Sequence, residues 1–178
     1  MDKNKDIYWI NTYMGVEFSL TDLTEEQILI EDVSHALSNL CRFSGHSKSF
    51  YSVAQHSVII SEIVPEKDAL WGLLHDSAEA YISDIPRPLK YLMGENVKKL
   101  ESDILKLVCR KFGLSEEMPD SVKLADDKML VTEMWCLMNM KQSWLPLRQT
   151  TPYHFNIVPV YPEKAKELFM MRFRELVK

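Results

Sequence analysis

The sequence predicts an all-α fold: a helical bundle of five to six helices, preceded by a short N-terminal hairpin or extended arm. From Glu31 onward, apolar residues recur every three or four positions, which is the period of amphipathic helices. The connections between these stretches are short, and no repeat or low-complexity tract interrupts them, which favours a bundle. With 178 residues, the chain is expected to form a single domain, residues 1–178, that buries its core without disulfide bonds.

The hairpin and the helices can be placed in chain order. Aromatic and β-branched residues surround Gly15, which predicts the hairpin or arm. Gly113 is a typical residue after a helix C-terminus, and Pro162 is a typical first-turn residue. Pro146 and Pro152 predict an irregular stretch before the last helix. The predicted helices run from Glu31 to Cys41, from Val53 to Val64, from Pro65 or Lys67 to Asp76, from Val97 to Phe112, from Asp120 or Ser121 past Met138, and from Pro162 to Leu176.

Composition and charge limit the binding partners and the cellular compartment that can be expected. The formal net charge is −5 and no basic cluster is present, so extended nucleic acid is not expected as a partner, whereas a small anionic ligand stays open. No apolar run approaches the ~18 residues of a membrane span. The polar residues 1–6 precede no apolar segment, so no signal peptide is expected. The cysteines are odd in number and widely spaced, which predicts reduced core thiols in a cytoplasmic protein. They are Cys41, Cys109 and Cys136.

The most informative stretch is residues 73–86, which contains an adjacent His75-Asp76 pair late in an apolar run. Two neighbouring polar side chains cannot both point into an apolar core, yet the segment is too apolar for a solvated face. Both side chains can instead bind one divalent cation, through an imidazole nitrogen and a carboxylate oxygen. Glu79 follows His75 by four residues and shares its helix face, which suits an acid–base carboxylate. The pattern predicts a metal-dependent hydrolase.

A catalytic metal needs three or four ligands, so further candidates must come from other elements. His56 lies in an amphipathic segment, where a polar residue faces either water or a site. For His35 and His46 the ordinary interpretation, a surface or hydrogen-bonded core histidine, is favoured. Asp126 borders an apolar stripe and Asp127 points further outward, and spacing alone favours a solvated surface for this pair.

The ordered set of an isolated His, a His-Asp pair and a distant Asp resembles the HD-domain metal-dependent phosphohydrolase superfamily. Within it, the match is strongest to small phage- and prophage-type proteins, which are similar to bacterial 5′-deoxynucleotidases and to phage dATP triphosphohydrolases. The Gly-Tyr-Pro signature of the cyclic-dinucleotide phosphodiesterase branch is absent, which disfavours that branch. The resemblance covers nearly the whole chain. The matching segments are 30–43, 51–57, 75–90 and 122–126.

The resemblance implies a role for each matching position. The implied metal ligands are His56, His75, Asp76 and Asp126. The implied cofactor is a divalent metal ion such as Zn, Mn, Co or Mg. The remaining positions are Glu79 as the catalytic carboxylate, Asp84 as a second active-site acid that contacts substrate, Arg42 and Lys90 as phosphate-facing cations, and Phe43 as a residue of the sugar and base pocket.

Two positions near the implied site stay open. Phe43 stands where the bacterial 5′-deoxynucleotidases often have Trp. Arg87, between Pro86 and Pro88, is either a cation beside the site or part of a rigid connection without a chemical role.

Hydrolysis of a deoxynucleotide is therefore the expected function. The favoured reaction converts a dNTP, with dATP as the favoured substrate, to deoxynucleoside and triphosphate. The alternative is a 5′-deoxynucleotidase that converts a dNMP to deoxynucleoside and phosphate. A nucleotide-binding regulator with slow turnover and a structural protein on a relict scaffold are two further alternatives. Glu79, Asp84 and all four ligands are present, which argues against both. The expected partners are a small-molecule deoxynucleotide and, because the family often forms homo-oligomers, further copies of the chain, with no extended nucleic acid and no membrane.

Overall fold

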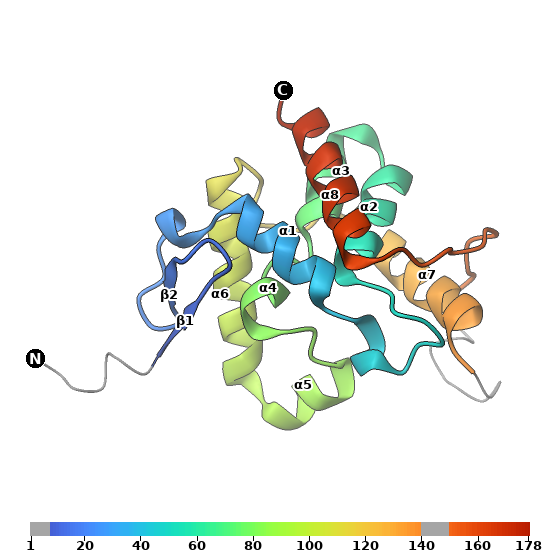
Figure 1. Cartoon of the computed structure of the whole chain (residues 1–178), viewed down its shortest axis with the longest axis horizontal. Helices are drawn as coiled ribbons and strands as arrows, with labels where there is room; N and C mark the ends of the chain where they lie inside the picture. Colours follow the sequence, from blue (N-terminus) through green and yellow to red (C-terminus); the bar gives the residue numbers. More distant parts are fainter. Residues whose placement is uncertain (1–7, 140–149) are drawn as a thin grey trace, which may run out of the picture.

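The computed structural model describes residues 8–139 and 150–178, and every structural statement below concerns these two ranges. They are mostly helical, as the sequence predicts, but they contain more helices than the five to six expected, and their strands form one two-stranded sheet. In Figure 1 the hairpin and α6 lie at one end of the molecule and α7 at the other. The elements are β1 (Trp9–Asn11), β2 (Glu17–Ser19), α1 (Ile30–Asn39), α2 (Val53–Ile63), α3 (Ala69–Leu74), α4 (Glu79–Ile82), α5 (Arg87–Met93), α6 (Glu95–Lys111), α7 (Asp120–Leu137) and α8 (Pro162–Leu176).

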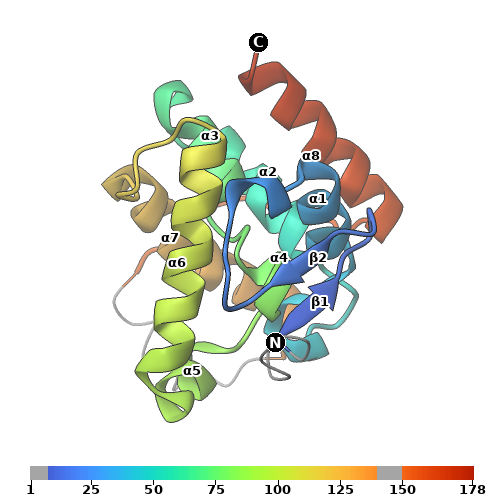
Figure 2. The same ribbon diagram turned by 90° about the vertical axis from the view of Figure 1, so that its left-hand side faces the viewer.

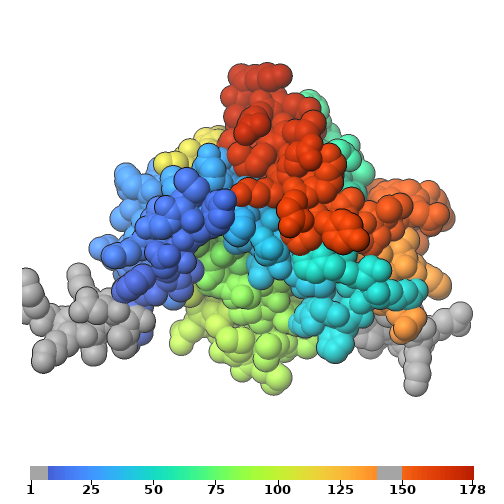
Figure 3. Space-filling model, viewed as in Figure 1, coloured from blue at the N-terminus to red at the C-terminus, as the bar shows by residue number. Residues whose placement is uncertain are grey.

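The predicted N-terminal hairpin is confirmed. β1 and β2 are antiparallel, and their register pairs Ile10 with Phe18. Gly15, in the connecting turn, has a φ of +80°, a conformation that other residues rarely adopt. Phe18 is fully buried and stacks on the ring of Tyr81 in α4, with the two centroids 3.8 Å apart. The hairpin is therefore anchored on α4 and forms one flank of the surface in Figure 3.

Helix α2 is the central helix of the bundle. It packs against α1, α3, α7 and α8, and Figures 1 and 2 both place it inside the fold. Its first turn is capped by Ser52, whose Oγ accepts the backbone N–H of Gln55 at 3.1 Å. Val53 and Ile60 are fully buried, because a helix with neighbours on several sides is apolar around most of its circumference. The same position buries His56 completely.

Helix α8 matches its predicted boundaries, whereas α6 (Glu95–Lys111) begins two residues before and ends one residue before the predicted ones. Helix α8 begins at Pro162 and covers α1, α2 and α3. Its residue Phe173 meets Phe112 edge to face, with the ring centroids 5.2 Å apart. Helix α6 runs along one side of the molecule in Figure 2 and ends before Gly113, whose φ is +69°.

The helix predicted to reach Asp76 is shorter than expected. Helix α3 ends at Leu74, and residues 75–78 form turns that lead into α4. The N–H of Ser77 donates to Leu74 O at 3.0 Å, and the N–H of Glu79 donates to Asp76 O at 3.0 Å. These tighter bonds replace the α-helical ladder, so the His-Asp pair leaves the regular helix.

Other boundaries are also corrected. The sequence predicts no helix after Pro86, but α5 forms there, because proline in the first turn of a helix loses no hydrogen bond. Helix α7 ends at Leu137 instead of continuing past Met138, whose backbone is extended. The irregular stretch is confirmed around Pro152, whereas Pro146 lies outside the described residues.

None of the described helices combines the length and the apolar character needed to cross a membrane. The three cysteines are free thiols, as predicted. Cys109 is buried, but Cys41 and Cys136 are only half-buried, so the expectation of core thiols is right for the first and wrong for the other two.

Candidate metal centre

The four predicted metal ligands lie together inside the bundle. His56 comes from α2, His75 and Asp76 follow α3, and Asp126 comes from α7. The Nε2 atom of His56 is 3.2 Å from the Nε2 atom of His75 and 3.2 Å from Oδ1 of Asp126. Oδ2 of Asp76 lies 3.2 Å from Nε2 of His75 and 3.7 Å from Nε2 of His56. Segments far apart in the sequence thus supply one compact set of nitrogen and oxygen atoms.

Hydrogen bonds on the outer side of each ring determine which histidine nitrogen faces the centre. Nδ1 of His75 is 2.8 Å from the carbonyl oxygen of Gly72, and Nδ1 of His56 is 2.5 Å from Oε1 of Glu133. A carbonyl and a carboxylate can only accept, so Nδ1 of each ring carries the proton. Each Nε2 then presents its lone pair to the centre, as metal-binding histidines do.

Close helix packing at Gly72 helps to place His75. A Cβ atom at position 72 would lie 3.1 Å from the backbone of Ser61 in α2, closer than most real contacts. Glycine therefore lets α3 approach α2, and the Gly72 carbonyl oxygen accepts the hydrogen bond from His75 Nδ1–H.

These distances and donor types fit a divalent cation. Two atoms bound to one cation at ~2.0–2.2 Å lie about 3.0–3.5 Å from each other, because the bond angles are near tetrahedral or octahedral. Two imidazole nitrogens and two carboxylate oxygens suit Zn, Mn, Co, Fe or Ni. Burial and the Arg42 charge lower the pKa of His56, but the carboxylates of Glu133 and Asp126 raise it to about 9, so Nε2 of His56 holds positive charge, either as a proton or as a bound cation.

The centre is closed on its histidine side and open on its carboxylate side. The side chains of His56 and His75 are 0% and 2% exposed, whereas those of Asp76 and Asp126 are 20% and 30% exposed. A ligand can therefore approach past the carboxylates, as a catalytic metal with open coordination positions requires.

Glu133 is a site residue that the sequence reasoning missed. Its carboxylate is fully buried in α7 and accepts hydrogen bonds from His56, Arg42 and Tyr51. Burial alone would raise the pKa of Glu133, but Arg42 and His56 outweigh it and hold this pKa below its ordinary value. The spacing in the sequence could have identified Glu133, because it follows Asp126 by two helical turns and therefore lies on the same face of the helix.

Arg42 lies beside the centre, but carboxylates of the protein already bind much of its guanidinium group. Nε donates to Oε2 of Glu133 at 3.1 Å, Nη2 forms an ion pair with the same oxygen at 3.0 Å, and Nη1 donates to Oδ2 of Asp76 at 3.4 Å. The next two residues, Phe43 and Ser44, have φ values of 56° and 51°. Residues other than glycine adopt this left-handed backbone conformation infrequently, and those that do cluster at functional sites. The half-buried ring of Phe43 has the Arg42 guanidinium carbon 5.6 Å from its centroid.

Glu79 and Asp84 bring two more carboxyl groups to the centre. Oε2 of Glu79 is buried and has no hydrogen-bond partner in the described part of the chain. Burial and the negative charges of Asp76 and Asp84 raise the pKa of Glu79 well above its ordinary value. Burial also raises the pKa of Asp84. Lys90 lies beside them, with Nζ 3.7 Å from Oε1 of Glu79 and 2.5 Å from Oε1 of Glu101.

Arg87 and the other histidines considered above lie outside this cluster. The Arg87 side chain is 63% exposed and 4.0 Å from Oδ1 of Asp127, which describes a weak surface ion pair. His35 stacks on Tyr13 beneath the hairpin, and His46 is exposed.

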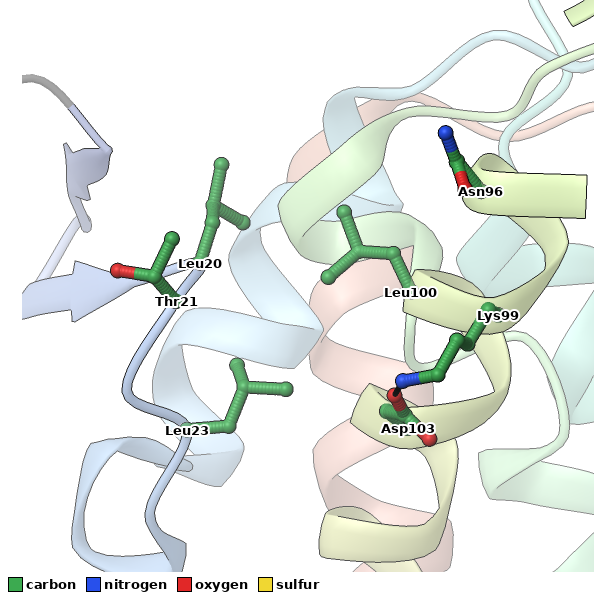
Figure 4. Close-up of a pocket in the computed structure, with 7 residues that line it drawn as sticks. All are labelled: Leu20, Thr21, Leu23, Asn96, Lys99, Leu100 and Asp103. Carbon is green, nitrogen blue, oxygen red and sulfur yellow. Dashed lines mark hydrogen bonds and ion pairs between the residues drawn. The ribbon is translucent and has the colours of Figure 1, made fainter.

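A surface pocket of about 280 Å³ lies between the segment that follows β2 and helix α6 (Figure 4). Lys99 in this pocket is paired with Asp103. None of the predicted site residues lines it. Its lining consists of Leu20, Thr21, Leu23, Asn96, Lys99, Leu100 and Asp103.

Comparison with known proteins adds relatives without an assigned activity. No family model matches the chain. It is 41% identical over 170 residues to the uncharacterized protein YfdR of Escherichia coli K12, a match that covers 94% of this chain and 95% of YfdR. It is 31% identical over 126 residues to the uncharacterized protein RCAP_rcc00048 of Rhodobacter capsulatus, which covers 66% of this chain and 64% of that protein.

Proposed function

The chain belongs to the same protein family as YfdR of Escherichia coli, and we propose that it is a metal-dependent phosphohydrolase of deoxynucleotides. One observation carries the proposal. The two imidazole Nε2 atoms are 3.2 Å apart inside the bundle, and each of them lies 3.2–4.0 Å from a carboxylate oxygen of Asp76 and of Asp126. Such a set of acceptor atoms needs a positive charge between them. The open carboxylate side, and the Oε2 atom of Glu79 that has no hydrogen-bond partner among the described residues, support catalysis rather than a purely structural metal.

His56, His75, Asp76 and Asp126 would hold the cation. When bound, a divalent cation withdraws charge from a phosphate oxygen and makes a water molecule more acidic. The two buried imidazoles close the inner side, so the chain admits substrate and water from the carboxylate side.

Glu79 would act as the general acid and general base of the reaction. Its raised pKa means that this carboxyl keeps a proton to a higher pH than an ordinary glutamate. It can therefore donate a proton to the leaving oxygen and, once ionised, accept one from the attacking water. Asp84 lies close enough to Glu79 to raise its pKa, and would contact the sugar or phosphate of the substrate.

Arg42 and Lys90 would supply positive charge to the phosphate oxygens. Nη1 of Arg42 points to Asp76 at 3.4 Å, and Nζ of Lys90 lies 3.7 Å from Glu79. Both cations therefore stand next to the groups that would meet the phosphate. Charge neutralisation of this kind is the main demand of phosphoryl transfer.

We propose that the substrate is a dNTP, with dATP as the favoured one. The resemblance to phage dATP triphosphohydrolases supports this choice, as does Phe43 at a position where the 5′-deoxynucleotidases often have Trp. In this reaction water attacks the α-phosphorus, the bond from phosphorus to O5′ breaks, and deoxynucleoside and triphosphate are released.

A second candidate, a 5′-deoxynucleotidase, is favoured by the pairing of the cations. Glu133 already binds Arg42, and Glu101 already binds Lys90 at 2.5 Å. These two side chains therefore offer little unpaired positive charge, which fits one phosphate group better than three.

A substrate panel tests the proposal. The purified protein would be incubated with each dNTP, NTP and dNMP in the presence of Mn, Co, Zn or Mg, and the products separated by chromatography. Deoxynucleoside with intact triphosphate from dATP supports the favoured reaction, and turnover of dNMPs alone supports the second candidate. Metal binding without turnover of any compound would overturn the proposal and point to a nucleotide-binding regulator.

A further inference from the structure

The carboxylate of Glu133 divides its two oxygens between two functional neighbours. Oε1 accepts Nδ1–H of His56 at 2.5 Å and the hydroxyl of Tyr51 at 2.9 Å. Oε2 accepts Nε–H of Arg42 at 3.1 Å and forms an ion pair with Nη2 of the same guanidinium at 3.0 Å. All four of these side chains are buried. One carboxylate thus joins a candidate metal ligand to the arginine nearest the centre.

We infer that Glu133 is a positioning residue that orients His56 toward the cation and holds the Arg42 guanidinium at the edge of the centre. The part that concerns Arg42 rests on the proposed function, whereas the part that concerns His56 requires only that the centre binds a metal. An imidazole held on its outer side by a carboxylate keeps its inner nitrogen unprotonated and becomes a stronger ligand.

The chemistry of the site requires a carboxylate at position 133. His56, Tyr51 and Arg42 all donate hydrogen bonds, and Glu133 is the acceptor that they share. A glutamine amide offers one oxygen and one NH₂ group. Its NH₂ would face either Arg42 or His56, so at least one bond would be lost and two donors would be opposed.

A purely structural role predicts a different result. Buried ion pairs often add little to stability compared with apolar side chains, so the network need not exist for folding. If Glu133 only joined α7 to the rest of the bundle, its substitution would weaken folding and leave the affinity for metal in the folded protein unchanged.

The metal affinity of the metal-free protein separates these roles. The dissociation constant for Zn²⁺ would be measured by competition with a chromophoric chelator, for the native protein and for the Glu133→Gln variant. We expect a 10- to 100-fold weaker affinity, the usual effect of losing the outer partner of a metal-binding histidine. Thr132→Val is the matched control, because Thr132 is buried next to Glu133 and accepts the N–H of Tyr153 at 2.9 Å. It should destabilise α7 and leave Zn²⁺ affinity unchanged.

A spectroscopic signature reports on His56 directly. In the Zn²⁺-loaded native protein, proton NMR should contain a strongly downfield, slowly exchanging Nδ1–H resonance from His56. In the Glu133→Gln variant this resonance should move upfield or exchange rapidly. If that variant does not fold, Glu133→Asp keeps the charge on a shorter side chain and should still weaken Zn²⁺ binding.

Native Zn²⁺ affinity with an unshifted His56 resonance, in either folded variant, would overturn the inference. So would an equal loss of affinity in Thr132→Val. These readouts need no substrate, so a failure of the proposed function leaves the His56 part intact. If the protein does hydrolyse deoxynucleotides, Glu133→Gln should also raise KM, since Arg42 loses its anchor.

Discussion

At the scale of single residues, Glu79 has the property that an acid–base group needs. Burial and the charges of Asp76 and Asp84 raise its pKa well above the ordinary 4.5. The folded protein therefore keeps a proton that the unfolded chain loses. The free energy of unfolding must fall as the pH rises from about 4.5 through the folded-state pKa. Glu79 thus destabilises the fold at neutral pH, which is consistent with a residue retained for chemistry.

We predict that Glu79→Gln reduces phosphohydrolase turnover by at least ~10²-fold, the usual contribution of a general acid or base. The same variant should be more stable than the native protein above pH 5, because its amide cannot ionise. Urea unfolding of both proteins in a chelator, from pH 4.5 to 8, measures the second effect.

The matched control is Glu95→Gln, since that side chain is 85% exposed in a surface pair with Lys98. Its unfolding curve should stay within ~0.5 kcal/mol of the native curve at every pH. A Glu79→Gln variant that is less stable than the native protein at pH 7, or equally active, would contradict this account of Glu79.

The sequence was informative about residues that bear a motif and uninformative about those that do not. His75, Asp76 and Glu79 stood out because polar side chains interrupt an apolar run. Spacing alone left Asp126 as a surface residue, and only the resemblance made it a ligand. Glu133 carries no such mark, because its partners lie 77 to 91 positions away and only the fold brings them together.

At the scale of elements, the connection from α4 to α5 is strained. Ser83 ends α4 with φ 71° and ψ 160°, a region of backbone conformation that is nearly restricted to glycine. The next residue is Asp84, so this unusual turn directs the chain that delivers a candidate active-site acid.

We predict that Ser83→Gly raises the free energy of unfolding by about 1 kcal/mol, because glycine adopts this conformation without steric cost. The control is Ser102→Gly, in the interior of α6 with ordinary helical backbone, which should lower stability by ~0.5 kcal/mol. Denaturant unfolding measures both changes, and a loss of stability in Ser83→Gly would contradict the strain.

Long helices with a regular apolar period were predictable, and short ones were not. Helices α1, α2, α6, α7 and α8 lie where the period places them. Helix α5 was not predicted, because two prolines are typical of a connecting loop. Proline in a first turn is nevertheless compatible with a helix. The break after Leu74 also carries no glycine or proline, so only the tight turns of residues 75–78 reveal it.

At the scale of the whole molecule, a bound cation would join three separate parts of the bundle. Its ligands come from α2, the turns after α3, and α7. Binding to the folded state alone stabilises by mass action, by about 2.7 kcal/mol at a metal concentration 100 times Kd. For a domain of this size that corresponds to a rise in Tm of roughly 5–10 °C.

We predict this rise in Tm when Zn²⁺ or Mn²⁺ is added to the chelator-treated protein, and its absence in Asp126→Asn. Asp127→Asn, which changes the exposed neighbour of Asp126, should respond like the native protein. Differential scanning fluorimetry with the three proteins tests the prediction. A similar rise in Asp126→Asn would place the metal elsewhere.

The most direct test follows turnover and metal occupancy together. Apo protein would be titrated with Mn²⁺ or Co²⁺, and at each step both the bound metal and the release of deoxynucleoside from dATP and from dAMP would be measured. The account predicts no turnover without metal and activity that rises in proportion to occupancy, reaching its maximum at one ion per chain. Turnover in the metal-free protein, or full occupancy without hydrolysis of either nucleotide, would contradict it.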